Sequence, residues 1–151
     1  MSDTFVPPEF ILPAPPAGDG FHLTPLLVEH TEADLDAWST SVEHIHATPG
    51  FEGHPWPDEP MTVERNREDL QGHVDDWEAR RGFTYSVVSD PDGEVVGCVY
   101  VYPSRTDGTE AHVRSWVRAS RPELDVPVDR LVSTWLAESW PFRAVEYAAR
   151  G

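Results

Sequence analysis

The segment that decides the fold is residues 83–119, which read FTYSVVSDPDGEVVGCVYVYPSRTDGTEAHVRSWVRA. It predicts three strands, over residues 83–88, 94–102 and 110–119. β-Branched and aromatic side chains dominate the first two runs, and the third has two alternating faces. The second run is apolar almost throughout, which is typical of a central strand covered on both faces. Residues 90–93, Asp-Pro-Asp-Gly, predict a tight turn between the first two strands. The segment therefore predicts neighbouring strands of one sheet with helices on each side.

The last of these runs has two different faces, because alternate residues of a strand point to opposite sides of a sheet. One face carries His112, Arg114, Trp116 and Arg118, and the other carries Val113, Ser115, Val117 and Ala119. A helix is expected from about Pro127, since proline suits the first turn of a helix, and a last strand is expected over residues 143–148. This strand–helix–strand connection predicts one parallel pair of strands.

The N-terminal half is predicted to add one strand and two helices. Residues 1–20 contain five prolines and are expected to form an extended arm, which leaves residues 21–151 as a single domain. A first strand is predicted over residues 21–26. Apolar residues recur at helical spacing over residues 31–45 and again over 62–81.

Capping residues mark the expected ends of these two helices. Thr31 and Thr62 are the predicted N-caps, since a threonine hydroxyl accepts hydrogen bonds from the first turn. Gly82 stands where a C-cap glycine is expected. The predicted class is therefore α/β (α+β), with a mixed, mostly antiparallel central sheet and helices on both faces.

This order of elements resembles the acyl-CoA N-acyltransferase fold of the GNAT (Gcn5-related N-acetyltransferase) superfamily. The resemblance covers roughly residues 21–150 and is carried by the strand that begins at Phe83-Thr84-Tyr85, by Val95-Val96-Gly97, and by Trp116-Val117-Arg118 ahead of a helix. It implies an N-acetyltransferase that moves an acetyl group from acetyl-CoA to the amine of an acceptor.

The resemblance also implies where the cofactor binds. In that family the strand corresponding to 110–119 splays from its parallel neighbour, here 144–149, and the pantetheine arm of CoA lies in the gap. The loop that follows gives its amides to the CoA pyrophosphate at a helix N-terminus. The cofactor-binding residues implied for this chain are Trp116, Val117, Arg118, Arg121, Val126 and Val128.

The loop departs from the family pattern, because residues 118–128 contain no glycine. Glu123 and Asp125 place negative charge where a diphosphate would lie, and Pro127 lacks an amide donor. Arg118 and Arg121 can offset part of this charge. We therefore expect CoA binding to be weakened, altered or lost.

Three residues are the candidate catalytic groups, on the model of family members that place a base at the start of the splayed strand. They are Glu110 and His112 at that strand and Tyr102 at the end of the adjacent strand. In the competing interpretation these residues have no catalytic role. His112 is then a half-buried histidine of a strand, and Tyr102 is an aromatic residue of the core or of its rim. The aromatic loop 51–57 is expected either to line an acceptor pocket or to plug the core beneath a long loop.

Two functions therefore remain open, an active acetyltransferase and a catalytically inactive GNAT-derived binding or assembly module. An unrelated mixed α/β domain is a third alternative. The family's further helix, which in many members carries a tyrosine that protonates the leaving thiolate, has no counterpart before Gly151. This leaves the strand at 144–149 as an expected edge, which favours a homodimer.

The charge of the chain limits its partners. It has 27 acidic residues against 11 arginines and no lysine, a formal net charge of −16. Such a field repels nucleic acids and anionic membranes, so neither is an expected partner. Because the acids gather in the N-terminal half, a cationic small-molecule or peptide amine is the expected acceptor. No metal site is predicted, Cys98 is expected to be buried and inert, and the absence of a secretory signal favours the cytoplasm.

Overall fold

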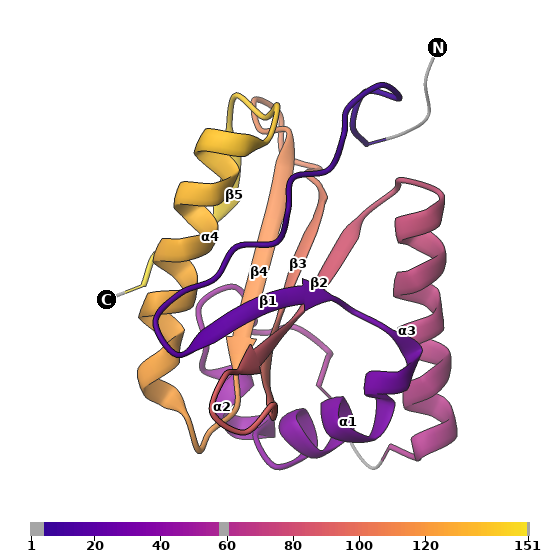
Figure 1. The fold of residues 1–151 in the computed structure, drawn as a ribbon, viewed down its shortest axis with the longest axis vertical. Helices are drawn as coiled ribbons and strands as arrows, with labels where there is room; N and C mark the ends of the chain where they lie inside the picture. Colours follow the sequence, from indigo (N-terminus) through magenta and orange to yellow (C-terminus); the bar gives the residue numbers. More distant parts are fainter. Residues whose placement is uncertain (1–4, 58–60, 151) are drawn as a thin grey trace.

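The computed structural model describes residues 5–57 and 61–150, which form one five-stranded sheet flanked by helices (Figure 1). The strands are β1 (Phe21–Pro25), β2 (Phe83–Ser89), β3 (Val95–Pro103), β4 (Ala111–Val117) and β5 (Val145–Tyr147). The α-helices are α1 (Thr31–Ser39), α2 (Val42–His46), α3 (Val63–Glu78) and α4 (Asp125–Ser139), and the short 3-10 helices are η1 (Val28–His30) and η2 (Pro122–Leu124).

The sheet confirms the predicted class. Its strands lie in the order β1-β2-β3-β4-β5, with every pair antiparallel except β4 and β5, which are parallel. The apolar run that forms β3 is the middle strand, as its composition predicts. Gly93 takes the positive φ of 69° that the turn between β2 and β3 requires.

Each face of the sheet has its own core. On one face, α4 and the N-terminal arm cover a cluster that includes Phe83, Tyr85 and Val113. On the other, α1, α2 and α3 cover a cluster centred on Trp38 and Trp116. The alternation predicted for β4 is confirmed, since valines face the first cluster and Trp116 the second.

The N-terminal arm lies over the sheet beside α4 (Figure 1). The ring of Phe5 stacks on Phe142 with 5.0 Å between centroids, and Phe10 packs on Trp140. The Arg80 guanidinium donates to the carbonyl oxygens of Pro7 and Phe10. The arm is thus part of the folded domain rather than a tail. Whether the β5 edge pairs with a second copy stays a prediction.

Two details of the first predicted helix are wrong. It is broken into α1 and α2 at Thr40 and Ser41, where the hydroxyl of Ser41 donates back to Ala37 O. Thr31 is the first helical residue rather than the N-cap, and its hydroxyl donates to Val28 O.

The second predicted helix has the expected start and a different end. Thr62 caps α3, because its hydroxyl accepts a hydrogen bond from the Arg65 amide. Gly82 is not the C-cap glycine: Arg80 takes the left-handed conformation, with a φ of 58°. Glycine is required at position 82 for another reason, since a Cβ there would lie 2.2 Å from the ring of Tyr102.

The helix expected from about Pro127 begins two residues earlier, at Asp125, and follows directly on η2. No helix within residues 5–57 and 61–150 has the length and apolar character needed to cross a membrane.

Candidate functional site

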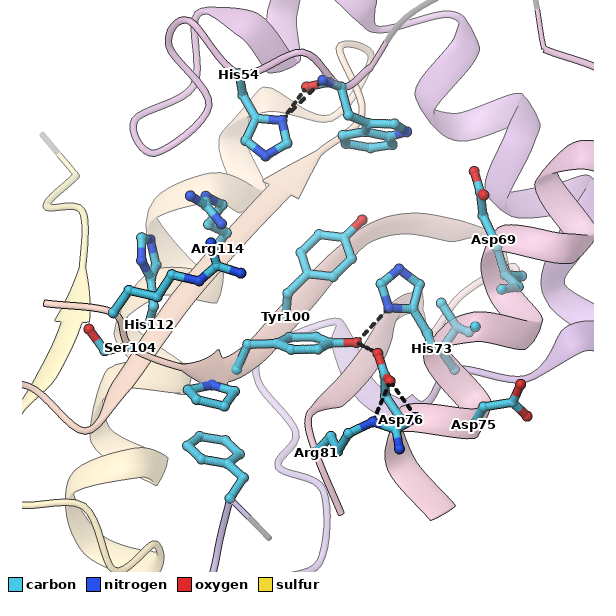
Figure 2. A pocket seen from close by; sticks show the side chains of 18 of the residues that line it. His54, Asp69, His73, Asp75, Asp76, Arg81, Tyr100, Ser104, His112 and Arg114 are labelled. Carbon is cyan, nitrogen blue, oxygen red and sulfur yellow. Dashed lines mark hydrogen bonds and ion pairs between the residues drawn. The ribbon is translucent and has the colours of Figure 1, made fainter. Parts of the chain in front are cut away.

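A hollow with a volume of about 1510 Å³ lies between α3, the end of β3 and the start of β4 (Figure 2). Its floor is made of Tyr100 and Tyr102 of β3. The aromatic loop predicted from the sequence forms one side, because Phe51, His54 and Trp56 all line the hollow. We refer to this space as the α3 pocket.

A chain of hydrogen bonds crosses the floor of the α3 pocket from an acid to a histidine. The Tyr102 hydroxyl donates to Asp76 Oδ2 (2.8 Å), and Asp76 is itself paired with Arg81. The same Tyr102 oxygen lies 2.8 Å from His73 Nδ1. The Thr84 hydroxyl oxygen lies 3.2 Å from the same Nδ1. Because the Tyr102 proton is given to Asp76, the Tyr102 oxygen faces His73 as an acceptor, which favours the tautomer with the proton on Nδ1.

His73 therefore presents its other ring nitrogen, Nε2, as a hydrogen-bond acceptor. Nε2 has no hydrogen-bond partner in the described part of the chain. Burial lowers the pKa of His73 below its usual 6.5, which keeps the ring neutral at pH 7. Figure 2 shows the ring between Tyr100 and Asp69. A neutral imidazole held in one tautomer is suited to accept a proton or an N–H donor.

The wall above this floor contains a buried carboxylate. Asp34 of α1 is 5% exposed and lines the α3 pocket. Its Oδ2 accepts a hydrogen bond from Asn66 Nδ2, whereas Oδ1 has no partner within the described residues. Burial raises the pKa of Asp34 to about 6, with the neighbouring charge of Asp69 adding to the effect.

The three predicted catalytic residues all line the α3 pocket. Tyr102 and His112 are opposite each other on β3 and β4, and both line the α3 pocket with Glu110. Glu110 accepts a hydrogen bond from the Arg143 amide. His112 Nδ1 lies 3.3 Å from Glu146, and burial together with the charge of Arg114 lowers the pKa of His112.

The pairing between β4 and β5 is short. The two strands pair over Ala111–Val113 and Val145–Tyr147, and the rest of β4 has no strand beside it on that side among the described residues, which leaves a gap. The gap is filled by the side chain of Arg150, which is 1% exposed. Its guanidinium donates to Ser115 O (2.7 Å) and to Asp125 Oδ2 (2.9 Å).

The loop beyond β4 has few amides to offer an anion. Five of them are already bonded within the protein: Arg118 N to Val96 O, Ala119 N to Ser41 Oγ, Arg121 N to Arg118 O, Leu124 N to Arg121 O and Asp125 N to Pro122 O. Pro122 and Pro127 have none. An anion cradle of the kind found at helix N-termini is therefore not formed here.

The residues implied as cofactor ligands are occupied elsewhere. Trp116, Val117 and Val128 are completely buried in the two cores. The Arg118 guanidinium binds Glu94 and Asp36. The remaining two are Arg121, paired with Glu123, and the half-buried Val126.

The CoA that the resemblance implies does not fit these residues as they are arranged. The β4–β5 gap holds the Arg150 side chain, five amides of the loop are bonded within the protein, and the Asp125 carboxylate lies at the helix start. Within residues 5–57 and 61–150 no group of three or more His, Cys, Asp or Glu side chains can hold a metal ion.

Sequence reasoning missed three residues of this region: His73, Asp34 and Arg150. Nothing in the helical spacing of His73 links it to Tyr102. By sequence alone, Asp34 is an acid in the first turn of a helix, where the helix dipole favours it. Arg150 lies three residues beyond Tyr147, the last paired residue of β5, and its side chain occupies the space that opens where the pairing with β4 ends.

No protein-family model matches this chain, and no curated protein matches it by sequence. Solved structures match it by shape. One is a ribosomal-protein-S5-alanine acetyltransferase from Vibrio fischeri, with a TM-score of 0.62, 12% identity, and coverage of 82% of this chain and 67% of that one. Another is an acetyltransferase from Salmonella typhimurium that modifies the N-terminal serine of ribosomal protein L7/L12, with a TM-score of 0.61, 14% identity, and coverage of 81% and 66%.

A third similar structure is FdhC, a nucleotide-linked sugar GNAT, with a TM-score of 0.65, 10% identity, and coverage of 90% of this chain and 72% of that one. The chain spans about two thirds of the length of the first two structures. At these identities the likeness concerns the fold. Taken with the sheet order and the parting of β4 from β5, it establishes that this chain has the GNAT fold.

Proposed function

We propose that this protein is a GNAT-fold binding protein that takes an organic amine, as its ammonium ion, in the α3 pocket. The observation that carries the proposal is Asp34, a carboxylate that is 5% exposed, lines the pocket and has one oxygen without a partner within the described residues. A carboxylate buried to this degree has lost most of its hydration and is stabilised by an ion pair. An ammonium ion bound in the pocket supplies the missing partner.

The surroundings of Asp34 suit the same ligand. The α3 wall adds Asp69, Asp75 and Asp76, so the potential of the pocket favours cations on that side. Aromatic rings of Tyr100 and Trp56 line the floor and one side, and such rings attract ammonium groups and cover the carbon chain of an amine.

A thermal-shift experiment tests this proposal. Hexylamine at millimolar concentration is expected to raise the Tm, because a ligand that binds only the native state stabilises it. D34N is expected to lose the hexylamine-induced shift, whereas D107N, which removes an exposed carboxylate outside the pocket, is expected to keep it. A shift of equal size in D34N would overturn the proposal.

Acetyl transfer to the same amine is the second candidate function, and one observation favours it. The β4 and β5 strands part beside the α3 pocket, at Val113 and Tyr147, which is where the GNAT fold provides its cofactor gap. The acetyltransferase activities of the similar structures are compatible with this candidate. A Tm increase with acetyl-CoA in the wild-type protein, together with acetylated amine detected by mass spectrometry, would favour it over the binding protein.

A further inference from the structure

We infer that the ligand of the α3 pocket is zwitterionic, an amine that carries a carboxylate at the far end of a short carbon chain. In this inference, which rests on the proposed function, Asp34 binds the ammonium group and Arg114 binds the carboxylate. The charge of the chain alone does not suggest an anionic group on the ligand, since the protein has a net charge of −16.

Arg114 forms no ion pair with a carboxylate of the described residues. It lies on β4, half-buried, and its side chain points into the α3 pocket (Figure 2). Only Nε has a hydrogen bond, to Gly50 O at 3.0 Å. Neither terminal nitrogen has a hydrogen bond or an ion pair with any residue of the described ranges.

The two arginines whose side chains are most deeply buried are neutralised by acids, whereas the half-buried Arg80 is paired with carbonyl oxygens. Arg118 binds Asp36 and Glu94, and Arg150 binds Asp125. With 27 acids available for 11 arginines, an inward-facing guanidinium without a counter-ion is unusual here. Its Nε is fixed by Gly50 O, so the two terminal nitrogens present a fork of N–H donors to the cavity. That fork matches the two oxygens of a carboxylate.

Tyr100 separates the two ends of the proposed ligand. Arg114 lies directly opposite Tyr100 on the neighbouring strand, while the His73 ring packs against the Tyr100 ring with 5.5 Å between centroids. Figure 2 shows Arg114 and His73 on opposite sides of that ring. Asp34 lies near the Tyr100 side chain. Burial raises the pKa of the Tyr100 hydroxyl, and the charge of Asp34 adds to that effect.

The two charges of the ligand are held apart, because their partners lie on different elements around Tyr100. Arg114 is on β4, directly opposite Tyr100, whereas Asp34 is on α1, and both line the α3 pocket. An α-amino acid, whose two charged groups are joined through one carbon, is too short to bridge them. A chain of about five methylene groups spans the ring of Tyr100, and its carbons lie against Trp56 as well.

Calorimetric titration with three probes of equal length tests the inference. The probes are 6-aminohexanoate, hexylamine and hexanoate, which carry both charges, the positive charge alone and the negative charge alone. The wild-type protein is expected to bind 6-aminohexanoate at least tenfold more tightly than hexylamine. Hexanoate is expected to give no binding, because the acids of the α3 wall repel it.

Two variants locate the carboxylate. R114Q is expected to bind 6-aminohexanoate no more tightly than hexylamine, while hexylamine binding stays within twofold of wild type. R67Q, which removes the same charge from the exposed side of α3, is expected to behave as wild type. Thermal melts of both variants check that they fold, and the wild-type comparison of the probes stands whether or not R114Q folds.

The outcomes separate this inference from the proposed function. Equal affinity of the wild-type protein for hexylamine and 6-aminohexanoate would overturn the zwitterionic ligand and leave the amine-binding proposal standing. A tenfold preference that persists in R114Q would overturn the role of Arg114. Absence of binding by both amine probes would overturn the proposed function itself.

Discussion

The guanidinium of Arg150 lies 2.7 Å from the carbonyl oxygen of Ser115, inside the gap that opens between β4 and β5. This side of β4 has no strand beside it beyond Val113 among the described residues, so the Arg150 side chain satisfies a backbone carbonyl there. The structure thus keeps the shape of the fold while the gap is closed by one of its own residues.

Replacing this residue with alanine is expected to destabilise the protein. R150A leaves Asp125, Ser115 O and Ala148 O without their donor, and breaking a buried ion pair costs about 3 kcal/mol, which corresponds to a Tm lower by roughly 10 °C. The exposed R143A is the matched control and is expected to melt as wild type. A thermal melt of R150A that coincides with wild type would show that the guanidinium does not occupy the gap.

The same variant also tests whether the loop beyond β4 binds acetyl-CoA. R150A is expected to give no Tm increase with acetyl-CoA, because the amides of Arg118, Ala119, Arg121, Leu124 and Asp125 remain bonded within the protein. A clear increase in R150A but not in wild type would instead mean that Arg150 alone closes the CoA site.

Two glycines of α3 and its end are expected to respond in opposite directions. G82A places a Cβ 2.2 Å from the Tyr102 ring, so the ring must move and the variant is expected to lose about 1–3 kcal/mol of stability. G72A meets no atom within 4 Å and replaces a helical glycine, so it is expected to gain about 0.5–1 kcal/mol. Urea unfolding measures both, and a G82A variant as stable as wild type would contradict the close contact with Tyr102.

Asp34 is expected to reduce stability near neutral pH. Its pKa is about 6 in the folded protein against 3.8 as the reference value, so its ionisation is penalised by folding. The penalty is absent below pH 3.8, grows as the pH rises to about 6, and is constant above. D34N is therefore expected to be more stable than wild type by about 2–3 kcal/mol above pH 6 and equal to it near pH 3.5. Unfolding free energies measured across this range would contradict the burial of an ionised Asp34 if the difference did not change with pH.

Amine binding is expected to follow the same ionisation. Hexylamine keeps its positive charge throughout this range, whereas Asp34 loses its negative charge as the pH falls through about 6. Affinity is therefore expected to be constant from pH 7 to 8 and to weaken progressively below pH 6, with Asp69 the nearest other carboxylate that affects the titration. Calorimetric Kd values across pH 5–8 are the measurement, and an affinity that rises toward pH 5 would argue against Asp34 as the anchor.

Much of this fold is readable from local pattern. The alternation of β4, the apolar run of β3 and the Asp-Pro-Asp-Gly turn each predict a local structure from a short stretch, and the order of the elements then predicts a mixed sheet. The break between α1 and α2 was missed because it depends on the Ser41 hydroxyl reaching Ala37 O. Gly82 was assigned to the wrong role, since its requirement comes from a ring 20 residues away in the sequence.

The α3 pocket was only partly predictable for the same reason. Glu110, His112 and Tyr102 were selected because a strand end is a local feature. His73 joins them through Tyr102, 29 residues later, and Asp34 joins through Asn66, 32 residues later. Such contacts depend on how α1 and α3 pack against the sheet. The spacing of residues within one helix does not predict that packing.

Co-crystals grown with hexylamine and acetyl-CoA present together would test the central claim most directly. The account predicts density for the amine in the α3 pocket, with its nitrogen within hydrogen-bond distance of Asp34 Oδ1, and the Arg150 side chain still in the gap between β4 and β5. Density for CoA in that gap, with Arg150 displaced and the α3 pocket empty of amine, would contradict it.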